Sequence, residues 1–386
     1  MTTSLDAPVG TAPPVPPAGK DTPTRQQKFS PAVALEMGGS LVAALATIWV
    51  IFTLAGIKAP FGLGVATFLL FLCIYGVLTW RLHGVLYMKD RLATVTVWSV
   101  SLAALVPLVS VILFVIIKGA PVALADFPHF FYADMSQLSP TGSVTEVGVG
   151  AAIVGTVEQV GIAMILAVPL GILCATFLVE SRSVYARFVG NVVDAMTGAP
   201  AIIFGLFVYL TWVAPHKTNG KSGFAAALAL TVMMLPIVTR TSQEVITIVP
   251  GSLREAAAAL GAPRWRILVR VVLPTARIGL ATAVILGVAR IAGETAPILF
   301  NAGGNNQYNW NPFKGQQDNL PLRVYELIFQ PSASAIRLAW GASFVLVLLV
   351  LLIFVIGRII GASGPGKRRM PISFLRRSGG SNDAGS

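Results

Sequence analysis

Long runs of apolar residues, separated by short polar segments, dominate the sequence. A run of about 18 or more uncharged, mostly apolar residues is long enough to cross a bilayer as a helix. Because lipid offers the backbone no hydrogen-bonding partner, each spanning run is expected to be helical. Seven runs reach this length: Met37–Ile57, Phe61–Trp80, Ala93–Ile117, Gln159–Val179, Ala195–Ala214, Ser222–Thr239 and Leu338–Gly357.

An eighth apolar run, Ile278–Phe300, is interrupted only by Arg290 and Glu294. The pattern therefore predicts an all-α, polytopic membrane helical bundle of about eight spans. Two connecting segments, 118–150 and 301–337, are long for a bundle, and long ordered loops are often functional. The second is rich in Asn and aromatic residues, and both a docking surface and a simple lid fit this composition.

Composition supports the membrane assignment. Of the 386 residues, 55% are hydrophobic and only 11% are charged, and the mean hydropathy is +0.77. A soluble domain carries about a quarter charged residues. Most Lys and Arg residues fall in segments that would share one side of the membrane, so the positive-inside rule predicts that both termini are cytoplasmic. Anionic lipid at that surface explains the net charge of +12, so no nucleic-acid partner is expected.

Both ends of the chain read as tails. Residues 1–32 are rich in Pro, Thr and Ala, which predicts a disordered cytoplasmic tail. This segment lacks the charged-then-apolar order of a cleavable signal, so we expect the first span to be retained. Residues 363–386 predict a basic cytoplasmic tail.

Chemical motifs for catalysis are weak. Lys221 and Ser222 resemble the end of a phosphate-binding loop, but Pro215 stands where that motif requires glycine. The three histidines are scattered, and the two cysteines lie inside predicted spans, which favours packing roles. We therefore expect no catalytic residue, metal site or cofactor in this chain. If ATP drives the protein, ATP and Mg²⁺ must bind a separate subunit.

A polar, arginine-rich segment at 250–274 separates two apolar runs. Ser252 and Glu255 have the spacing of a capping box, which predicts that a helix starts at Ser252. Gly261 can adopt the left-handed conformation that ends a helix, and Pro263 suits the first turn of the next one. The segment predicts a short surface helix, a sharp turn, and a second helix that enters the membrane.

Arg290 and Glu294 are costly within a span. Each charge costs about 2.5–3.5 kcal/mol at mid-membrane on insertion scales, so both should face the bundle interior or a water-filled cavity. On one helix, residues four apart share a face and can pair. A structural ion pair satisfies this pattern. So does a binding role, in which Arg290 offers a forked cationic donor to a tetrahedral oxyanion.

Three segments carry a resemblance to a known family. The first is Glu255-Ala256-Ala257 followed by Gly261, Val271, Leu273 and Pro274, which resembles the cytoplasmic loop of ABC importer permeases. The second is Asp194, Gly198, Pro200 and Phe204–Phe207, which resembles a further stretch of that family with Ala201 in place of Ser. The third is Arg290–Pro297 with its Gly293-Glu294-Thr295-Ala296-Pro297 core, which resembles the signature of PstA-type permeases of phosphate importers.

This resemblance implies a division of the chain and a set of roles. It implies a six-helix permease core at 93–362, with 33–80 as an extra N-terminal transmembrane hairpin. It further implies an inner-membrane importer. The residues implied to couple to the ATPase are Glu255, Ala256, Ala257, Leu260 and Gly261, and those implied to line the substrate pathway are Arg290, Glu294 and Thr295.

The implied partners are a homologous PstC-type permease, an ATPase subunit pair, an external phosphate-binding protein and membrane lipid. Two alternatives stay open from the residues alone. One is a permease for another oxyanion, such as molybdate or sulfate. The other is a secondary transporter or a non-transporting membrane scaffold.

Overall fold

The computed structural model describes residues 31–136 and 147–362. The predicted tail at 363–386 lies outside the described residues, as does the predicted tail at 1–32 except for its last two residues, which begin the first helix. Within these ranges the chain is helical, and its only sheet-like feature is one isolated bridge between Gly303 and Gln317. The chain divides into two compact units, with the boundary between Leu108 and Val109.

The first unit contains a pair of packed helices, α1 (Pro31–Leu54) and α2 (Pro60–His83), and the first part of α3 (Val85–Ala125). Ala44, Phe71 and Tyr75 form its buried centre. The rings of Phe71 and Tyr75 stack with their centroids 5.7 Å apart. Side chains from all three helices pack around this centre, so the start of α3 belongs to the hairpin's core.

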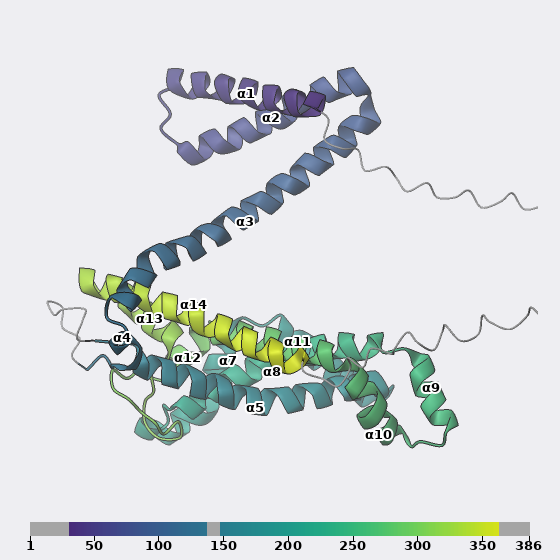
Figure 1. Cartoon of the computed structure of the whole chain (residues 1–386), viewed down its shortest axis with the longest axis vertical. Coiled ribbons are helices and arrows are strands. Elements are labelled where there is room, and N and C mark those ends of the chain that lie inside the picture. Colours follow the sequence, from purple (N-terminus) through teal and green to yellow (C-terminus); the bar gives the residue numbers. More distant parts are fainter. Residues whose placement is uncertain (1–30, 137–146, 363–386) are drawn as a thin grey trace, which may run out of the picture. The chain divides into compact units, whose positions relative to one another are not determined.

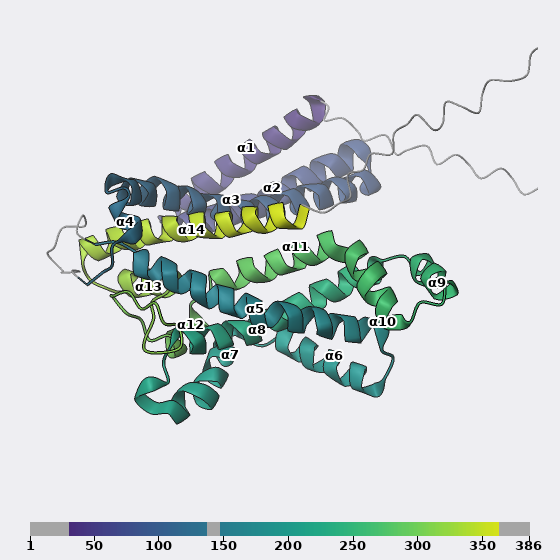
Figure 2. The same ribbon diagram turned by 60° about the horizontal axis from the view of Figure 1, so that its bottom comes forward.

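The second unit contains a bundle of long helices in which α5 packs on α8, α8 on α11, and α11 on α14 (Figures 1 and 2). Shorter helices, among them α9, α12 and α13, lie in the segments between the long ones. The elements after α3 are α4 (His129–Tyr132), α5 (Gly150–Glu180), α6 (Val184–Thr197), α7 (Ala201–Val208), α8 (Gly223–Ile248), α9 (Gly251–Ala259), α10 (Arg264–Ile267), α11 (Leu273–Ala292), α12 (Ala296–Asn301), α13 (Leu320–Ile328) and α14 (Ala333–Ala362).

Helix α8 is the centre of this bundle. In its most apolar 18-residue stretch 67% of the residues are buried, against 33% or less for every other candidate span. Val238 fills the space left by two glycines: a Cβ atom at Gly171 of α5 would come within 2.8 Å of Val238, and one at Gly287 of α11 within 2.9 Å. Membrane helices associate by close packing, and small residues permit it. These contacts set the spacing of α5, α8 and α11.

Seven described helices are long and apolar enough to cross a membrane, or eight if one bent pair counts as a span. This confirms the expected bundle of about eight spans. The expectation of one straight span at 195–214 is wrong, because α6 and the helical segment Ala201–Lys217 meet at 107°. Gly198 ends α6, and Pro200 disfavours helical geometry in the residue before it.

Three other predicted boundaries also change. Helix α3 extends from Val85 to Ala125, well beyond the predicted run, so the first long connection is shorter than expected. The second long connection contains α13. The run predicted at 278–300 begins earlier, at Arg264, and ends at Ala292. A π-helical turn at Leu268–Val272 precedes Pro274. In a regular α-helix the proline ring would clash with the carbonyl four residues earlier, and the wider turn accommodates it.

Two glycines on α5 give a matched test of this packing. A Cβ at Gly155 would overlap the carbonyl oxygen of Asp318, whereas one at Gly161 would have nothing within 4 Å. Overpacking typically costs about 1–3 kcal/mol, so Gly155→Ala should lower the apparent unfolding temperature of the purified protein. Gly161→Ala should match or slightly exceed the wild type. Equal unfolding temperatures for the two variants would contradict this contact.

Candidate functional site

The segment predicted to contact another protein forms an exposed helix, α9, that stands at the end of the bundle opposite α4 and α13 (Figures 1 and 2). Helix α9 buries none of its residues. Glu255 and Ala256 are exposed, Ala257 is half-buried, and Leu260 just beyond the helix is 89% exposed. An apolar side chain exposed to this degree at a sharp turn is available to a partner protein.

The turn after α9 is a Schellman motif. Gly261 has φ +76, its amide donates to the Ala258 carbonyl (2.9 Å), and the Ala262 amide donates to the Ala257 carbonyl (3.2 Å). Glycine adopts this left-handed conformation without steric cost. The predicted role of Gly261 as the turn residue is confirmed. Pro263 is the N-cap of α10, one position before the first turn in which it was predicted. The helix from Arg264 continues into the long apolar span, as predicted.

The predicted capping box is wrong. Helix α9 begins at Gly251, with Pro250 at the N-cap and no side-chain capping bond. Pro250 is extended (ψ 133) and its carbonyl accepts from the Leu253 amide, so the helix begins one residue before Ser252. Ser252 therefore lies inside the helix, past the position from which a hydroxyl caps the free amides. Glu255 keeps an exposed carboxylate on the surface of α9.

Arg290 and Glu294 form an ion pair across the end of α11. They do not share one continuous helix: α11 ends at Ala292, Gly293 caps it, and Thr295 precedes α12. The Arg290 side chain is 54% exposed on the surface of this chain, whereas that of Glu294 is 12% exposed. Both charges were expected to face the bundle interior or a water-filled cavity. Within this chain, Glu294 is buried in the bundle and Arg290 is not.

A buried asparagine that the sequence analysis missed holds this region in place. The Asn301 amide donates to the carbonyls of Pro297 (2.7 Å) and Gly205 (3.0 Å). Gly205 also lets α7 approach α12, because a Cβ there would come within 2.5 Å of Pro297. The stretch containing Gly205 and the stretch ending at Pro297 are thus packed together. No spacing in the sequence indicated this contact, since Gly205 and Asn301 are 96 residues apart.

At the α9 end of the bundle, arginines tie helices together. Arg240 of α8 forms an ion pair with Asp194 of α6 (2.5 Å) and donates to the Gly190 carbonyl (2.7 Å). Arg254 of α9 forms an ion pair with Glu180 of α5. From the sequence, both arginines were expected only to add positive charge on one side of the membrane.

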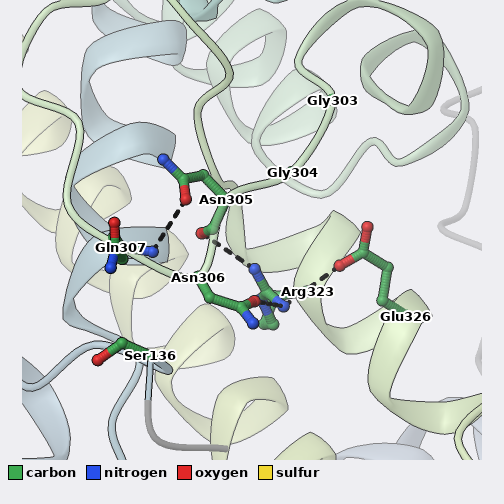
Figure 3. Close-up of a pocket in the computed structure, with 8 residues that line it drawn as sticks. All are labelled: Ser136, Gly303, Gly304, Asn305, Asn306, Gln307, Arg323 and Glu326. Carbon is green, nitrogen blue, oxygen red and sulfur yellow. Dashed lines mark hydrogen bonds and ion pairs between the residues drawn. The ribbon is translucent and has the colours of Figure 1, made fainter.

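At the opposite end, a buried ion pair joins α13 to the segment that precedes it. Arg323, whose side chain is 4% exposed, donates to Asp318 (2.8 Å) and to Asn306 (2.8 Å), and it lies 3.3 Å from Glu326. Arg323 and Glu326 line a polar pocket of about 430 Å³ together with Asn305 and Asn306 (Figure 3). Every nitrogen of Arg323 has a protein acceptor, since the third one donates to the Asn305 carbonyl. The guanidinium therefore holds this segment together.

The same segment, between α12 and α13, is hydrogen-bonded to α5. Gln159 donates to Gln317 and to the Asp318 carbonyl (3.1 Å each), and Asn319 donates back to Gln159 (3.0 Å). Glu158 accepts from Gln317 (2.5 Å). Burial raises the pKa of Asp318 to about 6, although the Arg323 guanidinium lowers it in part. One Asp318 oxygen is buried without a hydrogen-bond partner, which is consistent with a raised pKa.

The fold and the exposed surface helix define a multi-pass membrane subunit built to work with partner proteins. Residues 167–369 match the family described as "Binding-protein-dependent transport system inner membrane component". The chain belongs to this family and is a multi-pass inner-membrane protein.

Two relatives illustrate the similarity. The chain is 36% identical over 287 residues to "Phosphate transport system permease protein PstA 1" of Mycobacterium tuberculosis, covering 74% of this chain and 91% of that one. It is 37% identical to "Phosphate transport system permease protein PstA" of Pasteurella multocida, covering 54% and 74%. Among solved structures, a bacterial ABC transporter involved in alginate import aligns with a TM-score of 0.48 and 17% identity, covering 70% and 98%.

The turn at Gly261 has a direct test. A Cβ there would have nothing within 4 Å, so the constraint is the positive φ and not space. A side chain in this conformation costs about 1–2 kcal/mol, and asparagine tolerates it best. Gly261→Val should reduce transport by the assembled importer while its amount in the membrane stays near wild type, and Gly261→Asn should retain more transport. Equal transport by the two variants would show that the turn geometry is unimportant.

Asp318 gives a pH-dependent test. Its folded-state pKa of about 6 exceeds the model-compound value of 3.8, so folding favours the neutral acid. The contribution of this carboxyl to the free energy of unfolding therefore falls as pH rises from about 4 through 6, by about 1 kcal/mol between pH 5 and 7. When the pH is lowered from 7 to 5, the change in unfolding temperature should therefore be more stabilising, or less destabilising, for wild type than for Asp318→Asn. Glu326→Gln is the control, and identical shifts in wild type and Asp318→Asn would contradict the raised pKa.

Proposed function

We propose that this chain is the PstA-type permease subunit of an ATP-driven importer of inorganic phosphate, in which it forms half of the translocation pathway. The observation that carries the proposal is the placement of Arg290, half-exposed on the surface of the subunit and paired with Glu294 inside the Gly-Glu-Thr-Ala-Pro segment. The names of the relatives, which are phosphate transport permeases, support phosphate as the substrate.

The proposed pathway uses three neighbouring residues. Arg290 offers a permanently charged, forked donor that suits the oxygens of a tetrahedral oxyanion. Glu294 holds that guanidinium when no anion is bound and competes with the anion, which keeps binding weak enough for release. Thr295, which precedes α12, adds a hydroxyl beside the pair. A charge on the outer surface of one subunit is costly in lipid, so a second subunit is expected to cover Arg290.

The proposed partners follow from the family and from the exposed segments. A homologous PstC-type permease completes the pathway, and an external phosphate-binding protein delivers the anion. A pair of ATPase subunits binds ATP and Mg²⁺ and docks on α9 through Glu255, Ala256, Ala257, Leu260 and Gly261. Both termini lie in the cytoplasm, which places the α9 end of the bundle on the ATPase side.

In the proposed cycle, ATP closes the two ATPase subunits and α9 moves with them. The bundle then opens outward and accepts phosphate from the binding protein, and hydrolysis returns it to the inward-facing state. The rigid turn at Gly261 and the helix that follows it carry this motion toward Arg290, which lies in the last turn of the same helical segment.

Labelled phosphate uptake in cells that lack this chain tests the proposal. Wild type should restore uptake, and Arg290→Ala should reduce it at least about tenfold, since a charged hydrogen bond contributes about 1.5–3 kcal/mol. Arg290→Lys should retain part of the activity. Arg277→Ala, which removes an arginine from the other end of α11, is the matched control and should transport normally.

Competing anions decide the substrate. Excess sulfate or molybdate should leave phosphate uptake unchanged, whereas arsenate, which has the shape and charge of phosphate, should compete. Competition by sulfate or molybdate would instead favour an importer of another oxyanion. Wild-type uptake by Arg290→Ala, with the complex assembled, would remove Arg290 from the pathway.

A further inference from the structure

Helix α9 differs from the neighbouring elements in how it is attached to the bundle. The segment after it is anchored by apolar contacts: Val272 and Leu280 lie in a buried cluster with Ala175 of α5 and Ile246 of α8. Helix α9 buries no residue of its own. It therefore has no fully buried apolar side chain to anchor it to the bundle.

Arg254 is the α9 side chain that reaches the bundle. Its guanidinium forms an ion pair with Glu180, the last residue of α5, through one terminal nitrogen. Through the other it donates to the Ile246 carbonyl (3.1 Å) in the last turn of α8. The Arg254 side chain is only 25% exposed, so it is partly removed from water. A single residue thus connects α9 to the ends of two long helices.

Helix electrostatics favour this arrangement. The C-terminal end of a helix carries partial negative charge and unpaired carbonyls, and a cation is stabilised there. A carboxylate such as Glu180 is disfavoured at that end unless a cation neutralises it. Arg254 pairs with that carboxylate and also binds one of the terminal carbonyls of α8. Arginine suits both tasks because its guanidinium donates in two directions at once.

A cleft of about 550 Å³ lies around this contact, and both charged and apolar side chains line it. Glu180 and Arg182 line it from the α5 side, Arg254 and Glu255 from α9, and Arg264 from α10. Arg182 and Arg264 are exposed, and neither forms one of the ion pairs found in the described residues. Both partners of the Arg254–Glu180 pair line this cleft, so the link between α9 and α5 lies beside an open space instead of inside a packed core.

We propose that Arg254 is a positioning residue that links α9 to α5 and α8, so that movement of α9 is transmitted to the centre of the bundle. This inference rests on the proposed function, because it requires that an ATPase moves α9. Helix α5 then extends the link to the far end of the bundle, where Gln159 holds the segment before α13. Two routes leave α9: the turn at Gly261 into α11, and Arg254 into α5 and α8.

Charge reversal tests the pair in the full importer, reconstituted with its permease, ATPase and binding-protein partners. The measured quantity is the number of phosphate ions imported per ATP hydrolysed. Arg254→Glu and Glu180→Arg should each lower this ratio at least fivefold. The double variant should recover to within about threefold of wild type, short of full recovery because a glutamate at 254 cannot donate to the Ile246 carbonyl. Arg182→Glu, a reversal in the same cleft that leaves the pair intact, should keep the wild-type ratio.

A purely structural role would lower the amount of assembled complex and leave the ratio unchanged. If Arg254→Glu does not assemble, Arg254→Lys and Arg254→Gln replace it, and the ratio should fall in the order wild type, Lys, Gln. An unchanged ratio in these variants, or a double variant no better than the worse single one, would overturn the proposal. Failure of the wild-type complex to import phosphate would instead reject the proposed function.

Discussion

Close packing around α8 is the constraint on which the rest of the second unit depends. In a bilayer the lipid tails are as apolar as the helix surfaces, so the hydrophobic effect does not drive helices together. They associate where their backbones can approach closely and pack well. Gly171 and Gly287 provide this approach on two sides of Val238. With α5, α8 and α11 fixed in this way, the bundle can hold polar groups at its two ends without losing its shape.

The two ends of the bundle are organised by buried or half-buried charges with different partners. At the end near α13, Arg323 and Asp318 hold a long connection in place, and α5 receives it through a network of amide side chains. At the α9 end, Arg240 and Arg254 connect neighbouring helices through carboxylates and terminal carbonyls. Helix α5 takes part at both ends, which makes it a physical link between them.

Arg290 stands apart from these structural arginines. Arg323 has an acceptor for each nitrogen and is almost fully buried, whereas Arg290 pairs with one carboxylate and leaves half of its side chain on the surface. The arginines of the pairs at the α9 end, Arg240 and Arg254, are also less exposed (28% and 25%) than Arg290. The exposed guanidinium instead fits a site that is completed by a second subunit and an anion, as the proposed function requires. The burial of Glu294 fixes where that guanidinium rests.

The sequence by itself determined the class of fold, the approximate number of spans, the turn at Gly261 and the presence of two charges in one apolar run. Apolar run length and the conformational freedom of glycine are local properties, so a single chain segment displays them. The 107° bend between α6 and α7, the start of α9 at Gly251 and the end of α11 at Ala292 depended on where each segment packs. Tertiary structure alone decided the pairs Arg254–Glu180 and Arg323–Asp318 and the contacts of Asn301. Their burial or their partners follow from how the helices pack, and no local sequence pattern indicates this packing.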